Sequence, residues 1–171
     1  TWSSRLQTSS LGRLFDSVSA LLGLCPAASF DGQPAMRLES CINSFCSDKK
    51  HWQKAYQFQI ENNHDYMIIK LHEFWNALIY DIHGEISFSE ISLRFHTGLI
   101  KMFRKVCGQL RKQYGLNRVA LSGGCFQNQF LLYNSIQALQ KDKFQVFSHS
   151  KVPCNDGGLA LGQAVLASYV V

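Results

Sequence analysis

Apolar residues in the first half of the chain recur every three or four positions, as on one face of an amphipathic helix. The period is clearest over residues 11–22 and 91–110. Each run has serines before it, which can cap a helix, and a glycine near its end, which can terminate one. These residues are Ser9, Ser10 and Gly23 for the first run, and Ser87, Ser89 and Gly115 for the second. The pattern predicts two helices, the second capped by Ser87 or Ser89.

Between these helices the pattern changes several times. Asp31 and Gly32 form a turn signal, and Pro34 suits the first turn of a helix that runs to about Phe45. After that helix we expect a half-buried strand, a turn, and a segment that fits either a strand followed by a helix or one helix. These lie at residues 56–60, 62–65 and 66–80, in that order.

The second half of the chain repeats the order strand, glycine-containing loop, helix. The expected segments are a strand at 119–121, the glycines at 123 and 124, an amphipathic helix at 126–139, a strand at 143–148, a loop at 155–158 and a buried helix at 159–170. Two such units suggest one sheet with two ligand loops at the carboxyl ends of its strands, where open α/β sheets bind ligands. The fold class is therefore α/β, with a largely helical first half.

Gly123 and Gly124 give the first loop a possible chemistry. Paired glycines let the backbone come close to a ligand, and the unpaired N–H groups at the start of the next helix favour an anion such as phosphate. A tight connection between strand and helix is the alternative explanation of the same residues.

Length and composition are those of a globular protein. The chain has 171 residues, of which 46% are hydrophobic and 17% charged. This suffices for one core or for one lobe of a larger fold, so we treat residues 1–171 as a single domain or lobe. The first residue is Thr1 rather than Met, which leaves an excised piece of a longer protein and a natural truncation as alternatives. No apolar run approaches a membrane span, and the first ten residues lack a signal-peptide layout, so we expect a cytoplasmic protein without membrane contact.

Cysteines and basic residues suggest no further function. The six cysteines form no C-x-x-C pair, which favours buried free thiols in a cytosolic protein. The net charge of +5 includes a basic cluster on the helix expected at 91–110 and just beyond. Its members are Lys101, Arg104, Lys105, Arg111 and Lys112. Without interleaved aromatics or a nucleic-acid motif, we interpret the cluster as a solvated face and do not expect nucleic acid as a partner.

Five blocks of sequence carry a resemblance to a known family. They are Ser9-Ser-Leu-Gly-Arg-Leu-Phe-Asp16, Phe30-Asp-Gly-Gln-Pro-Ala-Met36, Arg94-Phe-His96, Leu121-Ser-Gly-Gly-Cys-Phe-Gln-Asn128 and Pro153-Cys-Asn-Asp-Gly-Gly-Leu-Ala-Leu-Gly-Gln-Ala164. In that order they resemble the C-terminal part of the HypF-type carbamoyltransferases of nickel–iron hydrogenase maturation. The blocks span nearly the whole chain.

The resemblance implies a fold and an activity. That family's domain is similar to the tRNA threonylcarbamoyl transferases and has the actin, sugar-kinase and heat-shock ATPase fold, of which this chain would be one lobe. The implied enzyme uses ATP to convert carbamoyl phosphate to carbamoyl-adenylate. It then transfers the carbamoyl group to the C-terminal cysteine of HypE, where dehydration gives the cyanide ligands of the hydrogenase. A tRNA threonylcarbamoyl transferase and a non-catalytic truncated binding lobe are the alternatives.

The resemblance also assigns a nucleotide site. Gly123 and Gly124 would approach the phosphates, and Asn128 would hydrogen-bond the nucleoside. Asp16 and the turn at Gly32 and Gln33 would line the ribose side. Plain alternatives are a helix cap for Asn128, a turn residue for Gly32 and a solvated surface position for Asp16. Related sequences often carry an acidic residue where this chain has Arg37, which leaves Glu39 or Asp16 for the ribose hydroxyls.

A metal site is implied at Asp156. This carboxylate would be one ligand of a divalent ion of unknown identity, and Gly157 would leave room for the ion and the nucleotide phosphates. The alternative for Asp156 is the cap of the last helix. The family's His-x-x-x-His pair is absent from this sequence and would lie upstream of Thr1, so the chain alone would hold one metal ligand of three and about half of the pocket. We interpret His96 and His149 as structural.

Overall fold

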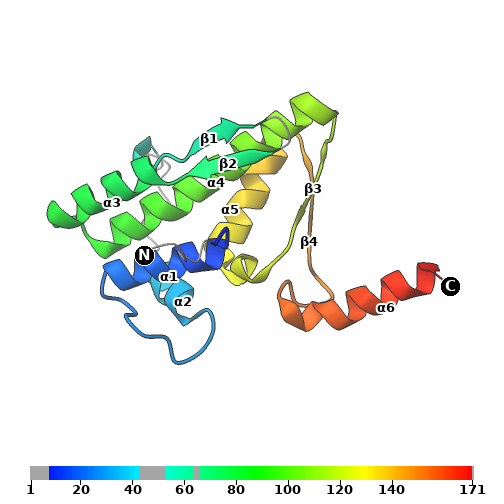
Figure 1. Ribbon diagram of the computed structural model, residues 1–171, viewed down its shortest axis with the longest axis horizontal. Coiled ribbons are helices and arrows are strands. Elements are labelled where there is room, and N and C mark those ends of the chain that lie inside the picture. Colours follow the sequence, from blue (N-terminus) through cyan, green and yellow to red (C-terminus); the bar gives the residue numbers. More distant parts are fainter. Residues whose placement is uncertain (1–7, 43–52, 64–65, 171) are drawn as a thin grey trace, which may run out of the picture.

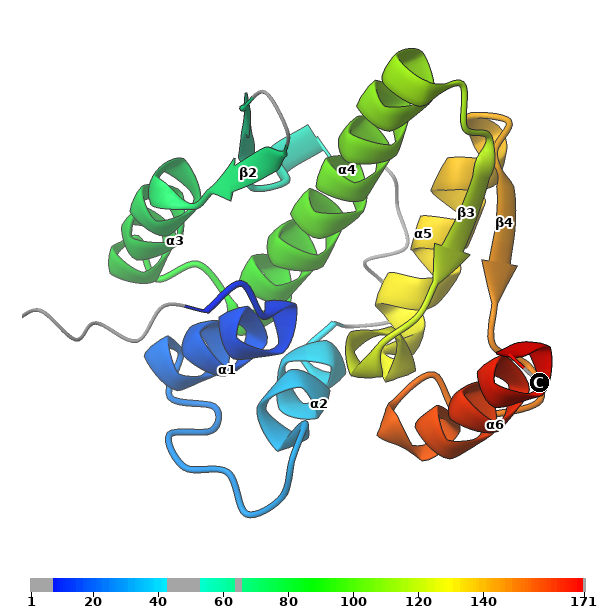
Figure 2. The same ribbon diagram turned by 45° about the vertical axis from the view of Figure 1, so that its right-hand side comes forward.

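The computed structural model describes residues 8–42, 53–63 and 66–170 (Figure 1). A helical part contains α1 (Leu11–Leu21), α2 (Gln33–Ser40), α3 (His72–His83) and the long α4 (Phe88–Tyr114). The two short strands β1 (Gln59–Asn62) and β2 (Met67–Lys70) form an antiparallel hairpin beside α4 (Figure 1). The remaining elements form a small α/β unit on the other side of α4 (Figure 2).

The first two helices begin as the sequence predicted. The Ser10 hydroxyl caps α1 by accepting a hydrogen bond from the backbone N–H of Arg13 at 3.4 Å. Gly32 has φ +83°, a conformation that glycine adopts without strain, and Pro34 lies in the first turn of α2. The helix ends at Ser40 rather than near Phe45, and residues 43–52, where the rest of that prediction falls, lie outside the described residues.

The ambiguous segment is a strand followed by a helix. Residues 67–70 pair with β1, and α3 follows from His72. The strand predicted at 56–60 is displaced, because β1 begins only at Gln59 while Tyr56 and Phe58 are buried in the core before it. Part of the predicted turn, residues 64–65, lies outside the described residues.

Helix α4 is the centre of the molecule. Ser87 caps it, and Gly115 ends it in the left-handed region with φ +70°. Every residue from Ile91 to Ile100 except Arg94 is buried. The aromatic core around this stretch includes Phe15, Phe74 and Phe95, each at most 1% exposed. Because α4 packs against the helical part on one side and against α5 on the other, it joins the helical part to the α/β unit.

The α/β unit has the predicted order of elements. Strands β3 (Arg118–Leu121) and β4 (Gln145–Ser148) are parallel and directly paired, joined by the 3-10 turn η3 (Gly124–Gln127) and α5 (Gln129–Lys141). After β4 come η4 (Asp156–Gly158) and α6 (Leu159–Val170). Helix α5 packs between the strand pair and α4 (Figure 2).

Two of the basic residues expected on a solvated face instead bind the end of α5. The Arg104 guanidinium donates two hydrogen bonds of 2.6 Å to the Asp142 carboxylate, and this holds the pKa of that carboxyl below its usual value. Arg111 donates to the Asp142 carbonyl oxygen at 2.9 Å and lies over the Phe144 ring. The basic cluster therefore serves partly to fasten α4 to α5.

The prediction that the last helix is buried is wrong for this chain. Helix α6 forms as expected, but its described side chains are exposed, among them Leu161 at 53%, Leu166 at 69% and Tyr169 at 84%. A helix that is apolar on all sides is buried only where other elements surround it. Figure 1 shows α6 beyond the carboxyl end of β4, running away from α1 and α2. None of the helices in the described ranges is long and apolar enough to cross a membrane.

Candidate nucleotide site

Two glycine loops meet at one edge of the strand pair. Since β3 and β4 are parallel, the loops that follow them leave from the same edge, with Leu121 opposite Ser148 in the register (Figure 2). The Gly123 N–H donates a hydrogen bond of 2.8 Å to the Cys154 carbonyl oxygen. A Cβ atom built on Gly124 would lie 3.9 Å from the Asn155 Cβ. The two loops are therefore in direct contact.

The backbone of the first loop suits an anion. Gly123 has φ +105°, which side-chain-bearing residues rarely adopt. The chain then forms η3 before α5 begins, so α5 starts later than the predicted position 126. The backbone N–H groups of Gly124 and of Asp156 have no acceptor among the described residues. Free N–H groups on adjoining loops are the donors that a phosphate needs.

Asp156 does not cap the last helix. Its neighbour Asn155 caps η4, the short turn before α6, since the Asn155 side-chain oxygen accepts from the Gly157 N–H at 3.1 Å. Asp156 is exposed, and its carboxylate has no hydrogen bond or ion pair within the described part of the chain. The alternative from the sequence is thus wrong, and the carboxylate has the freedom that a metal ligand requires.

The described residues provide only part of a metal site. No group of three His, Cys, Asp or Glu side chains within residues 8–42, 53–63 and 66–170 is arranged to hold an ion. A hard divalent cation is bound by several oxygen ligands, and Asp156 fits as one of them.

Helix α1 reaches the same edge. A Cβ atom on Gly12 would lie 3.9 Å from the Cys125 sulfur. Burial raises the pKa of the Cys125 thiol, and the Asp16 carboxylate raises it further. Asp16 forms an ion pair with Arg13 at 2.9 Å, and its side chain is 34% exposed.

Gln33 and Arg37 support the loop between α1 and α2. The Gln33 side-chain oxygen accepts from the Ser29 N–H at 2.8 Å and from the Ser29 hydroxyl at 3.1 Å. The Arg37 guanidinium donates to the Leu24 carbonyl oxygen at 2.7 Å. Arg37 therefore has a structural role at this position.

Glu39 joins α2 to the start of α5. Its carboxylate accepts from the Phe130 N–H at 3.0 Å, in the first turn of α5, where negative charge is favourable. This carboxylate is bound to the protein backbone, whereas the Asp16 carboxylate is paired with the exposed side chain of Arg13, and a ribose contact by either stays a prediction.

Asn128 is almost fully buried, with 6% of its surface exposed. Its side-chain oxygen caps α5 by accepting from the Leu131 N–H at 2.8 Å, as the plain alternative expected. Its amide nitrogen lies 2.8 Å from Nε2 of His96. A nucleoside contact by Asn128 stays a prediction, and it would have to use the amide hydrogen that these two bonds leave over.

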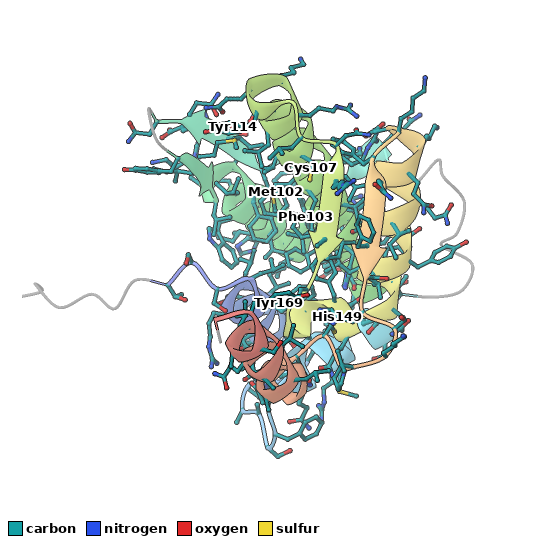
Figure 3. All side chains as sticks on the ribbon, turned by 90° about the vertical axis from the view of Figure 1, so that its right-hand side faces the viewer. Met102, Phe103, Cys107, Tyr114, His149 and Tyr169 are labelled. Carbon is teal, nitrogen blue, oxygen red and sulfur yellow. The ribbon has the colours of Figure 1, made fainter. Side chains whose placement is uncertain are left out.

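The sequence did not predict two histidine contacts near the loops. His96 is fully buried on α4, as its position on the apolar face indicates, but only the structure shows its bond to Asn128. His149 lies just after β4 (Figure 3), and its Nε2 is 2.9 Å from the Ser122 hydroxyl at the end of β3. Both Ser122 and His149 are exposed. Neither contact has a signal in the sequence beyond the positions of the strand ends.

Together these elements define an α/β lobe with two adjoining glycine loops at the carboxyl ends of parallel strands. Residues 3–163 match the family described as the second subdomain of the Kae1-like domain of carbamoyltransferases. The chain is 35% identical to the carbamoyltransferase HypF of Synechocystis sp. and 28% identical to a probable one of Methanocaldococcus jannaschii. These two alignments include 91% and 92% of this chain, but only 19% and 20% of the length of those proteins.

Solved structures show the same fold. A full-length HypF in a phosphate- and nucleotide-bound form is 40% identical, with a TM-score of 0.83 over 95% of this chain and 20% of the other. The HypF of T. kodakarensis is 25% identical, with a TM-score of 0.73 over the same shares. The chain belongs to the HypF family of carbamoyltransferases. This confirms the predicted α/β lobe and the family resemblance.

Proposed function

We propose that this chain is one lobe of an ATP-dependent carbamoyltransferase of hydrogenase maturation. The enzyme converts carbamoyl phosphate to carbamoyl-adenylate and transfers the carbamoyl group to the C-terminal cysteine of HypE. One observation supports this most directly: the bond between the Gly123 N–H and the Cys154 carbonyl oxygen, which brings both glycine loops to one place. Because the chain spans about one fifth of its relatives, the activity is proposed for the full-length protein.

The described residues have separate tasks in this proposal. The free N–H groups of Gly124 and Asp156 bind phosphate oxygens, and Gly157 keeps the second loop free of a side chain. Asp16 and the turn at Gly32 and Gln33 lie on the ribose side. In the transfer step the HypE thiolate attacks the carbamoyl carbon, a C–S bond forms, and the C–O bond to the adenylate phosphate breaks, so that AMP leaves.

Asp156 would hold a divalent metal ion together with ligands from outside the described residues. Such an ion would offset the phosphate charge and polarise the carbamoyl group. The exposed, unpaired carboxylate at the start of η4 supports this assignment.

Two substitutions in the full-length protein test the proposal. Gly124→Val fits the folded chain, because Gly124 does not have positive φ and its Cβ would meet only Asn155 at 3.9 Å, yet the valine fills the mouth of the loop. Asp156→Ala removes the carboxylate and nothing else. We expect both to abolish thiocarbamate formation on HypE while Gly162→Val and Glu73→Ala, at exposed positions on α6 and α3, retain it.

Undiminished transfer in both site variants would overturn the site assignment. Replacing HypE by tRNA as the acceptor separates the proposal from its nearest alternative. Threonylcarbamoylation of tRNA without carbamoylation of HypE would show that the chain serves the related tRNA enzyme instead.

A further inference from the structure

A buried histidine contacts Asn128, the residue that follows the first glycine loop and η3. His96 is on α4 with no exposed surface, and the rings of Phe15, Phe95 and Phe130 pack edge-on against its imidazole. Nδ1 of His96 lies 2.8 Å from the Ser92 carbonyl oxygen. Nε2 lies 2.8 Å from the side-chain nitrogen of Asn128. The ring therefore connects the backbone of α4 to the residue that caps α5.

These contacts determine where the ring proton is. A backbone carbonyl oxygen can only accept, so Nδ1 of His96 must carry the hydrogen. Burial lowers the pKa of His96 to about 4, so the ring is neutral near pH 7 and Nε2 has a free lone pair. The Ser92 hydroxyl, 3.3 Å from Nδ1, donates its own hydrogen to the Leu38 carbonyl oxygen of α2 and does not compete for this role.

The ring in turn determines the orientation of the Asn128 amide. Because Nε2 can only accept, Asn128 must present its nitrogen to His96 and its oxygen to the Leu131 N–H, which lies 2.8 Å away. Rotating the amide by half a turn would place oxygen against the Nε2 lone pair and nitrogen against an N–H, which costs two buried hydrogen bonds.

One donor of Asn128 is left over. The amide nitrogen has two hydrogens, and His96 takes one of them. The other has no acceptor among the described residues, although Asn128 keeps 6% of its surface exposed beside η3 and the glycine loop.

We propose that His96 is a positioning residue of the nucleotide site. Its neutral imidazole fixes the Asn128 amide so that the second N–H faces the ligand and selects a hydrogen-bond acceptor of the nucleoside. This inference rests on the proposed nucleotide site. It gives His96 a task beyond filling the core, since an apolar side chain of similar size would fill the same space but leave the amide free to rotate.

Binding of ATP to variants of the full-length protein, measured by calorimetry, tests the inference. We expect His96→Leu to weaken ATP binding about tenfold, the effect of losing one well-placed hydrogen bond. His96→Gln, whose side-chain oxygen can accept in place of Nε2, should restore binding to within about threefold of the wild type. The matched control is His83→Leu at the exposed end of α3, which should change nothing.

A double substitution separates positioning from simple destabilisation. If His96 acts through Asn128, the variant carrying both His96→Leu and Asn128→Ala binds ATP no more weakly than Asn128→Ala alone. Additive losses would overturn the inference, as would unchanged affinity in His96→Leu. Nitrogen NMR of the wild type provides a test that needs no variant: the Nδ1–H tautomer supports the proposal and the Nε2–H tautomer overturns it. A wild-type protein that binds no ATP would instead overturn the nucleotide site itself.

Discussion

The second glycine loop folds closely on itself because Gly158 has no side chain. A Cβ atom at this position would lie 2.7 Å from the Pro153 carbonyl oxygen and 3.7 Å from Cγ2 of Val152. The first distance is shorter than folded proteins tolerate, and the contacting atom belongs to the backbone, so Gly158→Ala forces the loop to move. Cys154 directly follows Pro153, and its carbonyl oxygen accepts the 2.8 Å hydrogen bond from the Gly123 N–H. The movement therefore reaches the contact between the two loops.

The expected loss has two parts. Overpacking by one methyl group costs about 1–3 kcal/mol, and weakening one backbone hydrogen bond costs about 1 kcal/mol. Since part of the strain relaxes as the bond lengthens, we expect a total of about 2 kcal/mol. Gly162→Ala in α6 is the matched control, because its Cβ would meet no atom within 4 Å. Alanine there should be neutral or stabilise the helix by up to about 1 kcal/mol.

Urea denaturation measures the stability of both variants, and calorimetry measures their affinity for ATP. We expect Gly158→Ala to lower both the unfolding free energy and the affinity, and Gly162→Ala to lower neither. Equal stability and equal affinity in the two variants would refute the argument that the loops depend on the close approach at Gly158.

Three further predictions concern charged and titrating groups. The pKa of His96 is lowered to about 4 from 6.5, so the unfolded chain binds the proton more tightly than the folded protein does. The free energy of unfolding should therefore be highest above about pH 6.5 and fall by about 3 kcal/mol as the pH drops to about 4. His96→Gln should reduce this pH dependence, as measured by urea denaturation at several pH values. Asp81→Asn removes the charge of one of the two carboxylates that pair with the Arg94 guanidinium at 2.6 Å, the other being Glu90, and should cost about 1–3 kcal/mol by denaturation. Because Arg94 is only 12% exposed, a loss under about 0.5 kcal/mol would contradict a buried ion pair. Arg104→Met breaks the pair with Asp142, but Arg104 is 40% exposed, so we expect a loss of no more than about 1 kcal/mol that shrinks in high salt; a salt-independent loss would show that packing dominates.

Local signals predicted most of the elements because their causes lie within a few residues. The caps Ser10 and Ser87 and the terminating Gly115 act on their own helices, and each is observed at the expected boundary. Helix α5 begins at Gln129, after its cap Asn128, and not at position 126. The strand and helix at 66–80 needed the pairing with β1 to be distinguished, because their apolar residues fit both periods.

The candidate site was predicted in its parts but not in its contacts. The sequence indicated the residue types at both glycine loops, yet assigned the possible cap role to Asp156 rather than to Asn155. Glu39 binds Phe130, 91 positions away, and no periodicity reports a contact of that range. The sequence did not indicate that Asp16 acts on the Cys125 thiol, because this depends on how α1 packs against η3.

By itself the sequence determined the order of strands and helices, the parallel α/β half and the glycines at the strand ends, since these follow from propensity and hydrophobic period. Only the tertiary structure decided that the two loops touch, that His96 controls the Asn128 amide, and that α6 keeps its apolar side chains in solvent. The reason is physical: burial, hydrogen-bond partners and tautomers depend on which distant residues share the same space, and local pattern does not specify that.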